Sequence, residues 1–171
     1  TGTGYSTANF SNWGSFATSI LLIMMLIGGC TGSTTGGIKI FRIQFLILII
    51  FKELKKIKSP RTVFTLSYKN SIVDEEIINP VMIIIILFFI GIFIISGIFS
   101  LHGYDFLTSV SAAITSICVV GPGMGHIIGP ENSFHSLPST LKFTLSFGMI
   151  LGRIEFLSFI LLLIPNFWFS K

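Results

Sequence analysis

The stretch Gly28-Gly-Cys-Thr-Gly-Ser-Thr-Thr-Gly-Gly37 interrupts a long apolar region and decides the fold of this chain. The uncharged segment 15–27 precedes it, and the largely apolar segment 38–51 follows it. Half of its residues are glycine and the rest are small or hydroxylated, so it cannot form a stable helix in lipid. Its backbone groups need protein or a water-filled cavity around them. Such backbone at membrane depth is typical of proteins that move solutes, so the sequence predicts part of a transporter or channel.

The composition of the chain is that of a polytopic membrane protein. Of its 171 residues, 51% are hydrophobic and 11% are charged. Residues 81–99 carry no charge, and as a helix they span about 28 Å, close to the thickness of the hydrocarbon core. The chain opens at Thr1 without a charged n-region. We therefore expect no signal peptide and interpret the chain as the C-terminal part of a longer protein.

The positive charges are unevenly distributed, which predicts an orientation in the membrane. The segment 101–141 contains no Lys or Arg, whereas six cationic residues lie between two apolar segments: Lys52, Lys55, Lys56, Lys58, Arg61 and Lys69. This positive-inside pattern places 52–76 in the cytoplasm and 101–138 outside. It also makes a nucleic-acid-binding patch the weaker interpretation of the net charge of +4, and we expect no nucleic-acid partner.

Apolar segments and breaking residues divide the chain into three parts. Residues 1–58 form a polar loop and one crossing that the glycine-rich stretch interrupts. A cytoplasmic linker is expected at 59–79. Residues 80–171 contain an outward crossing, a helix at 106–117 that is too short to span, a glycine-bearing loop and a final crossing at 139–164.

The short helix at 106–117 is predicted to be re-entrant, with Asp105 at its N-cap. A re-entrant helix points its partially negative C-terminal end into the membrane, and the loop after it can present carbonyls to a dehydrated cation. Residues 1–57, a polar glycine-containing loop followed by a crossing, match the end of an earlier copy of the same unit. The predicted fold is therefore an all-α membrane protein with helix–pore loop–helix repeats of a channel-like cation pore and a broken inner helix.

Two glycine-bearing segments are candidates for a cation selectivity filter. In Thr1-Gly-Thr-Gly-Tyr-Ser-Thr7, small residues and glycine let successive carbonyls line one axis. Val119-Val-Gly-Pro-Gly123 has the corresponding position after the re-entrant helix. Turns rich in glycine and threonine are common, and the second segment also fits an ordinary Gly-Pro turn, so these alternatives stay open.

Arg153 lies near the middle of the final predicted crossing, with Glu155 two residues further on. A charge at that depth is costly unless it faces a cavity or a partner. Residues two apart do not share a helix face, so we expect different surroundings for the two. Arg153 either projects into a permeation pathway and regulates cations there, or belongs to an internal pair that holds helices together.

Two other interpretations of 28–37 are weaker. A phosphate-binding loop requires Lys after its second glycine, and Ile38 stands there instead. Glycines 28, 32 and 36 have the small-xxx-small spacing of packed helices, but the stretch is too rich in Gly, Ser and Thr for a continuous helix.

Cysteine and histidine usage predicts neither a metal site nor a disulfide framework. We expect Cys30 and Cys118 to be packing residues. The three histidines are expected in solvated external loops without metal-ligand spacing: His102, His126 and His135. No cofactor is expected in this chain.

Four stretches together closely resemble the TrkH-type potassium-uptake subunits of the Trk/Ktr/HKT superfamily, and the resemblance covers the whole chain in order. They are residues 27–39, Thr-Gly-Tyr-Ser-Thr at 3–7, Gly-Pro-Gly-Met-Gly at 121–125 and Leu-Gly-Arg-Ile-Glu at 151–155. Members have four helix–pore loop–helix repeats around one pore, with one filter glycine per repeat. The resemblance implies that 1–58 holds the end of the third pore loop and the broken inner helix of repeat 3. Residues 80–171 would be the complete repeat 4.

The resemblance also implies a function, K+ uptake across the bacterial inner membrane by a multi-pass homodimer surrounded by membrane lipid. A cytosolic nucleotide-binding regulatory subunit of the TrkA type would gate it, and K+ would be the transported ion. The residues that offer filter carbonyls would be Gly2, Thr3, Gly4, Val119, Val120 and Gly121. Gating would fall to Arg153, which narrows the pore, and to the intramembrane loop with Gly28, Gly29, Gly32, Gly36 and Gly37.

The chain departs from the family pattern immediately before the fourth filter. Two asparagines usually stand there, and this sequence has Cys118 and Val119. If carbonyls coordinate the ion, permeation survives this change. If the amides brace the filter from behind, selectivity changes. A membrane enzyme that uses Arg153, Glu155 and the external histidines, or a non-conducting fragment, remains the alternative.

Overall fold

The computed structural model describes residues 2–30, 32–33, 35–59, 67–68, 71–72, 75–125 and 127–164. Its helices are α1 (Ser15–Ile27), α2 (Ile40–Lys58), α3 (Glu75–Leu101), α4 (Phe106–Cys118), α5 (Ser139–Ile154) and α6 (Phe156–Leu163). Two 3-10 turns, η1 (Phe10–Asn12) and η2 (Phe134–Ser136), and a hairpin of β1 (Ser67–Tyr68) antiparallel to β2 (Ser71–Ile72) complete the order. The predicted all-α fold is confirmed, and the sequence pattern missed the small hairpin.

Several residues used in the sequence analysis lie outside this described part of the chain. They are Thr1, Thr31 and Thr34 of the glycine-bearing stretches, Arg61 and Lys69 of the cationic cluster, and His126. Most of the expected linker at 59–79 lies outside it as well.

Helix α3 is the longest in the structure and the first candidate membrane span. Within the described residues, its segment Ile78–Leu101 is the one continuous helix long and apolar enough to cross a membrane, with 24 residues. The helix begins at Glu75, so the end of the expected linker at 59–79 belongs to it. Pro80 stands in its second turn, where the missing N–H removes one intrahelical hydrogen bond.

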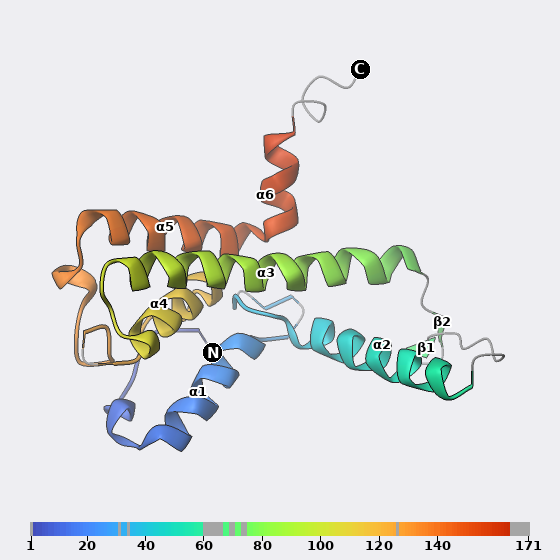
Figure 1. Ribbon diagram of the computed structural model, residues 1–171, viewed down its shortest axis with the longest axis horizontal. Coiled ribbons are helices and arrows are strands. Elements are labelled where there is room, and N and C mark those ends of the chain that lie inside the picture. The colour runs from blue at the N-terminus through green and yellow to red at the C-terminus, as the bar shows by residue number, and fades with distance from the viewer. Residues whose placement is uncertain are drawn as a thin grey trace.

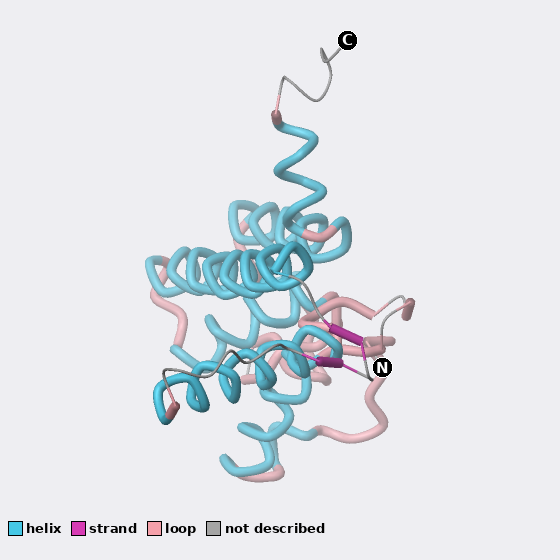
Figure 2. The backbone as a smooth tube through the Cα atoms, turned by 90° about the vertical axis from the view of Figure 1, so that its right-hand side faces the viewer, coloured by secondary structure: helices cyan, strands magenta, loops and turns pink. Residues whose placement is uncertain are grey.

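The final crossing predicted at 139–164 is wrong as a single helix. Helix α5 ends at Ile154, α6 begins at Phe156, and the two are bent by 100°. Glu155 between them has a φ of 65°, in the left-handed region that non-glycine residues rarely adopt and that interrupts helical hydrogen bonding. The N-terminal part of α6 still contacts α3 and α5, and the helix then projects away from the helical body in both views (Figure 1 and Figure 2).

Helix α4 lies at the centre of the molecule, in contact with α1, α3 and α5 (Figure 1). It has 13 residues, which rise about 20 Å and cannot cross the hydrocarbon core. Ala112 and Ala113 on it are completely buried, because small side chains let the longer helices approach closely. Asp105 occupies the N-cap position but makes no capping hydrogen bond through its side chain, contrary to expectation. A short, buried helix agrees with the predicted re-entrant segment.

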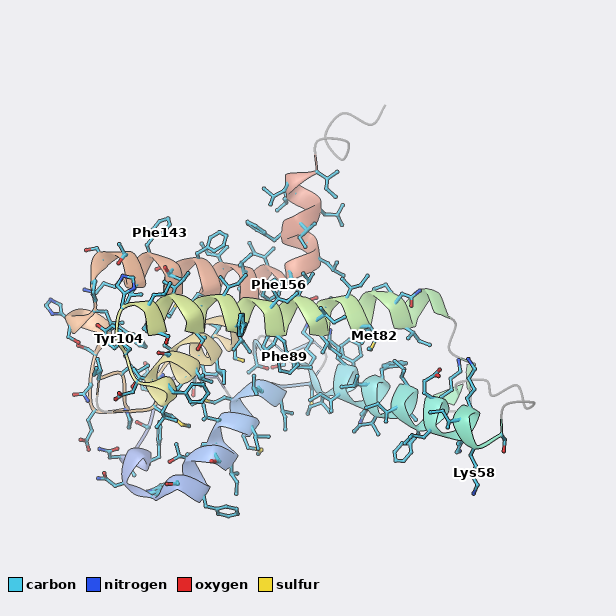
Figure 3. All side chains as sticks on the ribbon, viewed as in Figure 1. Lys58, Met82, Phe89, Tyr104, Phe143 and Phe156 are labelled. Atoms are coloured by element: carbon cyan, nitrogen blue, oxygen red, sulfur yellow. The ribbon has the colours of Figure 1, made fainter. Side chains whose placement is uncertain are left out.

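Large apolar side chains are exposed on the outer faces of the helices. Phe93 on α3 is 80% exposed and Phe143 on α5 is 77% exposed. Figure 3 shows Phe143 pointing away from the helical body. Extended apolar surface of this kind is typical of helices that face lipid or further helices.

Candidate ion pathway

The two predicted filter segments lie against each other, although they are far apart in the sequence. A Cβ placed on Gly121 would lie 2.8 Å from the Cα of Gly4, and one placed on Gly4 would lie 3.2 Å from the carbonyl oxygen of Val120. A Cβ on Gly2 would lie 3.5 Å from the carbonyl oxygen of Val119. Gly4 and Gly121 have φ values of 78° and 118°, which favour glycine. Glycine is therefore required at both Gly4 and Gly121, because of the backbone conformation and because the two segments approach each other closely there.

Hydroxyl groups of α4 hold the second of the predicted filter segments in place. The N–H of Gly121 donates to Oγ1 of Thr115 at 3.1 Å, and the N–H of Val120 donates to the Thr115 carbonyl at 3.0 Å. Further along, the N–H of Met124 donates to Oγ of Ser111 at 3.0 Å. These bonds satisfy backbone groups that would otherwise be unpaired at membrane depth.

Thr115 and Ser111 are functional candidates that the sequence analysis missed. They hold the loop from α4, at positions before Cys118 and Val119, where the family pattern has two asparagines. The signal that could have found them is the spacing of Thr108, Ser111 and Thr115, which places hydroxyls on one face of a short apolar helix.

The glycine-rich stretch is non-helical in all of its described residues, as predicted, so the alternative of a continuous packed helix is wrong. Two backbone hydrogen bonds join the two ends of the stretch. The N–H of Ile38 donates to the carbonyl of Leu26 at 2.9 Å, and the N–H of Ile40 donates to the carbonyl of Gly29 at 3.2 Å. Cys30 is exposed, so its expected packing role is wrong, whereas Cys118 is buried as expected.

The glycine-rich stretch also packs directly against the end of α4 and the predicted filter segments. A side chain at Gly36 would overlap the carbonyl group of Cys118, and one at Gly28 would overlap the carbonyl oxygen of Gly36. A Cβ on Gly2 would lie 3.2 Å from Cγ2 of Thr35. By contrast, Gly32 has open space around it. Glycine is therefore required at Gly36, where the stretch meets α4, and at Gly28, where the two ends of the stretch contact each other.

Thr35 and Gly36 line two different cavities. One has a volume of about 280 Å³ and is lined on its other sides by residues of the predicted filter segments, which include Gly4 and Val120. The second has a volume of about 320 Å³, and its charged lining residues are Lys39, Arg42, Arg153 and Glu155. The glycine-rich stretch thus separates a cavity beside the filter segments from a charged cavity.

Glu155 is bound by two cations from the start of α2. Its Oε1 lies 2.6 Å from Nζ of Lys39, and its Oε2 lies 2.7 Å from Nη2 of Arg42. The guanidinium of Arg42 also lies 5.4 Å from the ring centroid of Phe41. Arg153 lines the same cavity from the end of α5 and is exposed. Arg153 and Glu155 thus line one cavity, contrary to the expectation that they have different surroundings.

The pairing of Glu155 with Lys39 and Arg42 was missed because it joins distant parts of the sequence. The available signal was two cations three residues apart in an apolar segment, which require a counter-charge at membrane depth. Nothing local identifies Glu155 as that counter-charge.

Close packing fixes the position of the α5–α6 bend. A side chain at Gly152 would overlap the carbonyl oxygen of Ile117 at the end of α4. On the other side of the bend, the ring of Phe156 meets that of Phe88 on α3 edge to face, with centroids 6.3 Å apart. Arg153 and Glu155 therefore project from a backbone that α3 and α4 hold.

Within the described residues, no group of three or more His, Cys, Asp or Glu side chains could hold a metal ion. His102 and His135 are both exposed, and Nδ1 of His102 lies 2.9 Å from the carbonyl of Ile98. That the chain needs no cofactor stays a prediction.

Comparison with known proteins identifies the family. A model of the TrkH family, described as cation transport protein, matches residues 1–169. This chain belongs to the TrkH family. The predicted resemblance is therefore confirmed, and the family is one of transport proteins, in agreement with a transporter rather than an enzyme.

Relatives of this TrkH-family chain include two potassium uptake proteins. The Trk system potassium uptake protein TrkI of Halomonas elongata is 38% identical over 168 residues, which are 98% of this chain and 34% of the relative. The Trk system potassium uptake protein TrkH of Vibrio parahaemolyticus is 32% identical over 174 residues, again 98% of this chain and 34% of the relative. The chain thus spans about a third of the length of these relatives.

A solved structure has the same fold as the TrkH-family chain. The crystal structure of the potassium transporter TrkH from Vibrio parahaemolyticus matches with a TM-score of 0.86 and 31% identity. The match covers 98% of this chain and 35% of that one. It confirms the all-α membrane fold.

Proposed function

We propose that this TrkH-family chain contributes two filter segments to a K+ uptake pathway, with K+ as the transported ion. The contact between Gly4 and Gly121, at the C-terminal end of a short buried helix, carries the proposal. The filter residues would be Gly2, Thr3, Gly4, Val119, Val120 and Gly121. Backbone carbonyls can replace the hydration shell of a cation, and the partially negative end of α4 favours positive charge.

The loop at 28–37 and Arg153 together form the gate in this proposal. The loop lies between the filter-side cavity and the charged cavity, so its position would decide whether the two communicate. Arg153 lines the charged cavity and would repel K+ electrostatically. The glycines that let the loop pack against α4 would let it change conformation without steric penalty.

The whole protein is proposed to work as a multi-pass homodimer in the bacterial inner membrane, in contact with lipid and regulated by a cytosolic nucleotide-binding subunit of the TrkA type. The names of the relatives, which are Trk system proteins, support this assignment. The exposed apolar faces of α3 and α5 support burial against lipid or further helices.

Uptake of K+ is the direct test of this function. Cells that lack other K+ uptake are expected to grow on low K+ when they express the full-length protein, and proteoliposomes that contain it are expected to accumulate Rb+. The isolated 171-residue chain is the matched negative control, because two filter segments cannot close a four-segment pore. A full-length protein that folds but takes up neither ion would contradict the proposal.

Thiol labelling tests the proposed orientation. With native cysteines replaced by serine, Ser133→Cys is expected to react with a membrane-impermeant reagent from outside, whereas Lys56→Cys reacts after permeabilisation only. Both positions are exposed in the structure, so access to the reagent depends on the side of the membrane. The reason is the excess of cationic residues around Lys56. The reverse labelling pattern would invert the topology.

A further inference from the structure

A single carboxylate joins the two interrupted helical segments of the chain. Glu155 lies at the break between α5 and α6, and its two oxygens bind Lys39 and Arg42, which follow the break between α1 and α2. The two breaks are therefore tied together by charge, in addition to their packing against α4.

The carboxylate end of this connection is held rigidly. Gly152 packs on the end of α4 and Phe156 packs on Phe88, so the backbone on both sides of Glu155 is fixed. Glu155 itself has a φ of 65°, which a side chain tolerates only where the surroundings impose it. The carboxylate is thus an anchor point that belongs to the α3–α4–α5 body.

The cationic end of the connection lies directly after the glycine-rich stretch. Lys39 follows Ile38 and precedes the first residue of α2, so a bond that fixes Lys39 restrains the C-terminal end of the stretch. Arg42 is 6% exposed, and its Nε is buried without a hydrogen-bond partner within the described residues. The guanidinium therefore depends on Glu155 for its buried charge, and loss of the carboxylate would force the start of α2 to move.

We propose that Glu155 is a positioning residue, an ionic clamp that holds the glycine-rich loop in its pathway-blocking position by fixing Lys39 and Arg42. This inference rests on the proposed gating function of 28–37. With the clamp intact, the loop remains packed against Cys118 of α4; without it, the loop leaves that position more often.

A purely electrostatic role for Glu155 makes the opposite prediction for one variant. If Glu155 only offsets the positive charge of the cavity, Glu155→Gln makes the cavity more positive and lowers cation flux, whereas Lys39→Met raises it. A clamp predicts that both variants raise flux, because each one removes the bond between the loop and the body. The two variants together therefore distinguish a positioning role of Glu155 from a purely electrostatic one.

The experiment uses the full-length protein in proteoliposomes without a regulatory subunit. Rb+ flux per folded protein is measured together with the mobility of a spin label on the exposed Cys30, other accessible cysteines being replaced by serine. Glu155→Gln and Lys39→Met are each expected to raise flux by about fivefold or more and to increase label mobility. Glu53→Gln, which removes an exposed carboxylate from the same helix α2, is the matched control and is expected to change neither.

Each outcome decides the proposal. Unchanged label mobility in both variants, or lower flux in Glu155→Gln, would overturn the clamp. Lys39→Met keeps the buried pair between Arg42 and Glu155, so it still decides the question if Glu155→Gln fails to fold. If the parent protein conducts no Rb+ at all, the proposed function fails, while label mobility alone still shows whether Glu155 positions the loop.

Discussion

Replacement of Gly121 by aspartate is expected to abolish K+ uptake. The residue has a φ of 118°, and its Cβ would lie 2.8 Å from the Cα of Gly4, so the side chain would force the two filter segments apart. The backbone strain alone is about 1–3 kcal/mol. The carboxylate would also compete with backbone carbonyls for the cation. Growth on low K+ and Rb+ uptake per folded protein are the measurements.

The matched control for this variant is Gly103→Asp. Gly103 has a φ of 83° and open space around it, in the exposed turn after α3. It therefore receives the same carboxylate and a comparable backbone strain without touching a filter segment, and uptake is expected to remain. Normal uptake by Gly121→Asp would remove Gly121 from the filter.

Replacement of Arg153 by alanine is expected to raise ion flux about tenfold or more. Two unit charges of the same sign, roughly 6 Å apart at an effective dielectric constant of 20, repel each other by about 3 kcal/mol. Removing this repulsion lowers the barrier by more than a tenfold increase in flux requires. Arg153 lines the charged cavity beside the loop, so its removal lowers this barrier for K+. Shortening the 28–37 loop by several residues is expected to act in the same direction. Flux into proteoliposomes, normalised to folded protein, is the measurement.

Arg153→Lys keeps the charge and serves as the control, with flux expected to stay at the parent level. If Arg153 only held helices together, alanine would lower the amount of folded protein and leave the flux per folded molecule unchanged or reduced. That result would leave Arg153 a structural residue and assign gating to the loop alone.

Local physical chemistry made the main features of the fold predictable. Ten residues rich in glycine and hydroxyl groups cannot continue a helix, and the structure breaks between α1 and α2 at that point. The long uncharged run at 81–99 and the short run at 106–117 became the spanning helix α3 and the short central helix α4. In each case the length of the run and the identity of its residues decide the outcome, whatever the rest of the chain does.

The bend at Glu155 was not predictable in the same way. The segment 139–164 has the apolar character of one crossing, and no glycine or proline marks the break at residue 155 itself. The backbone turns there because Phe156 packs on Phe88 and the carboxylate reaches Lys39 and Arg42. These interactions exist only after α2 and α3 have been brought beside α5.

The sequence by itself determined where most helices form, that the glycine-rich stretch interrupts one of them, and which glycines could supply filter backbone. The tertiary structure decided which partners those groups have: Gly4 beside Gly121, Thr115 bonded to the returning loop, and Glu155 bound to two cations of α2. The physical reason is the range of the interactions. Helix propensity and backbone freedom act within a few residues, whereas contacts and ion pairs depend on which surfaces the packed helices bring together.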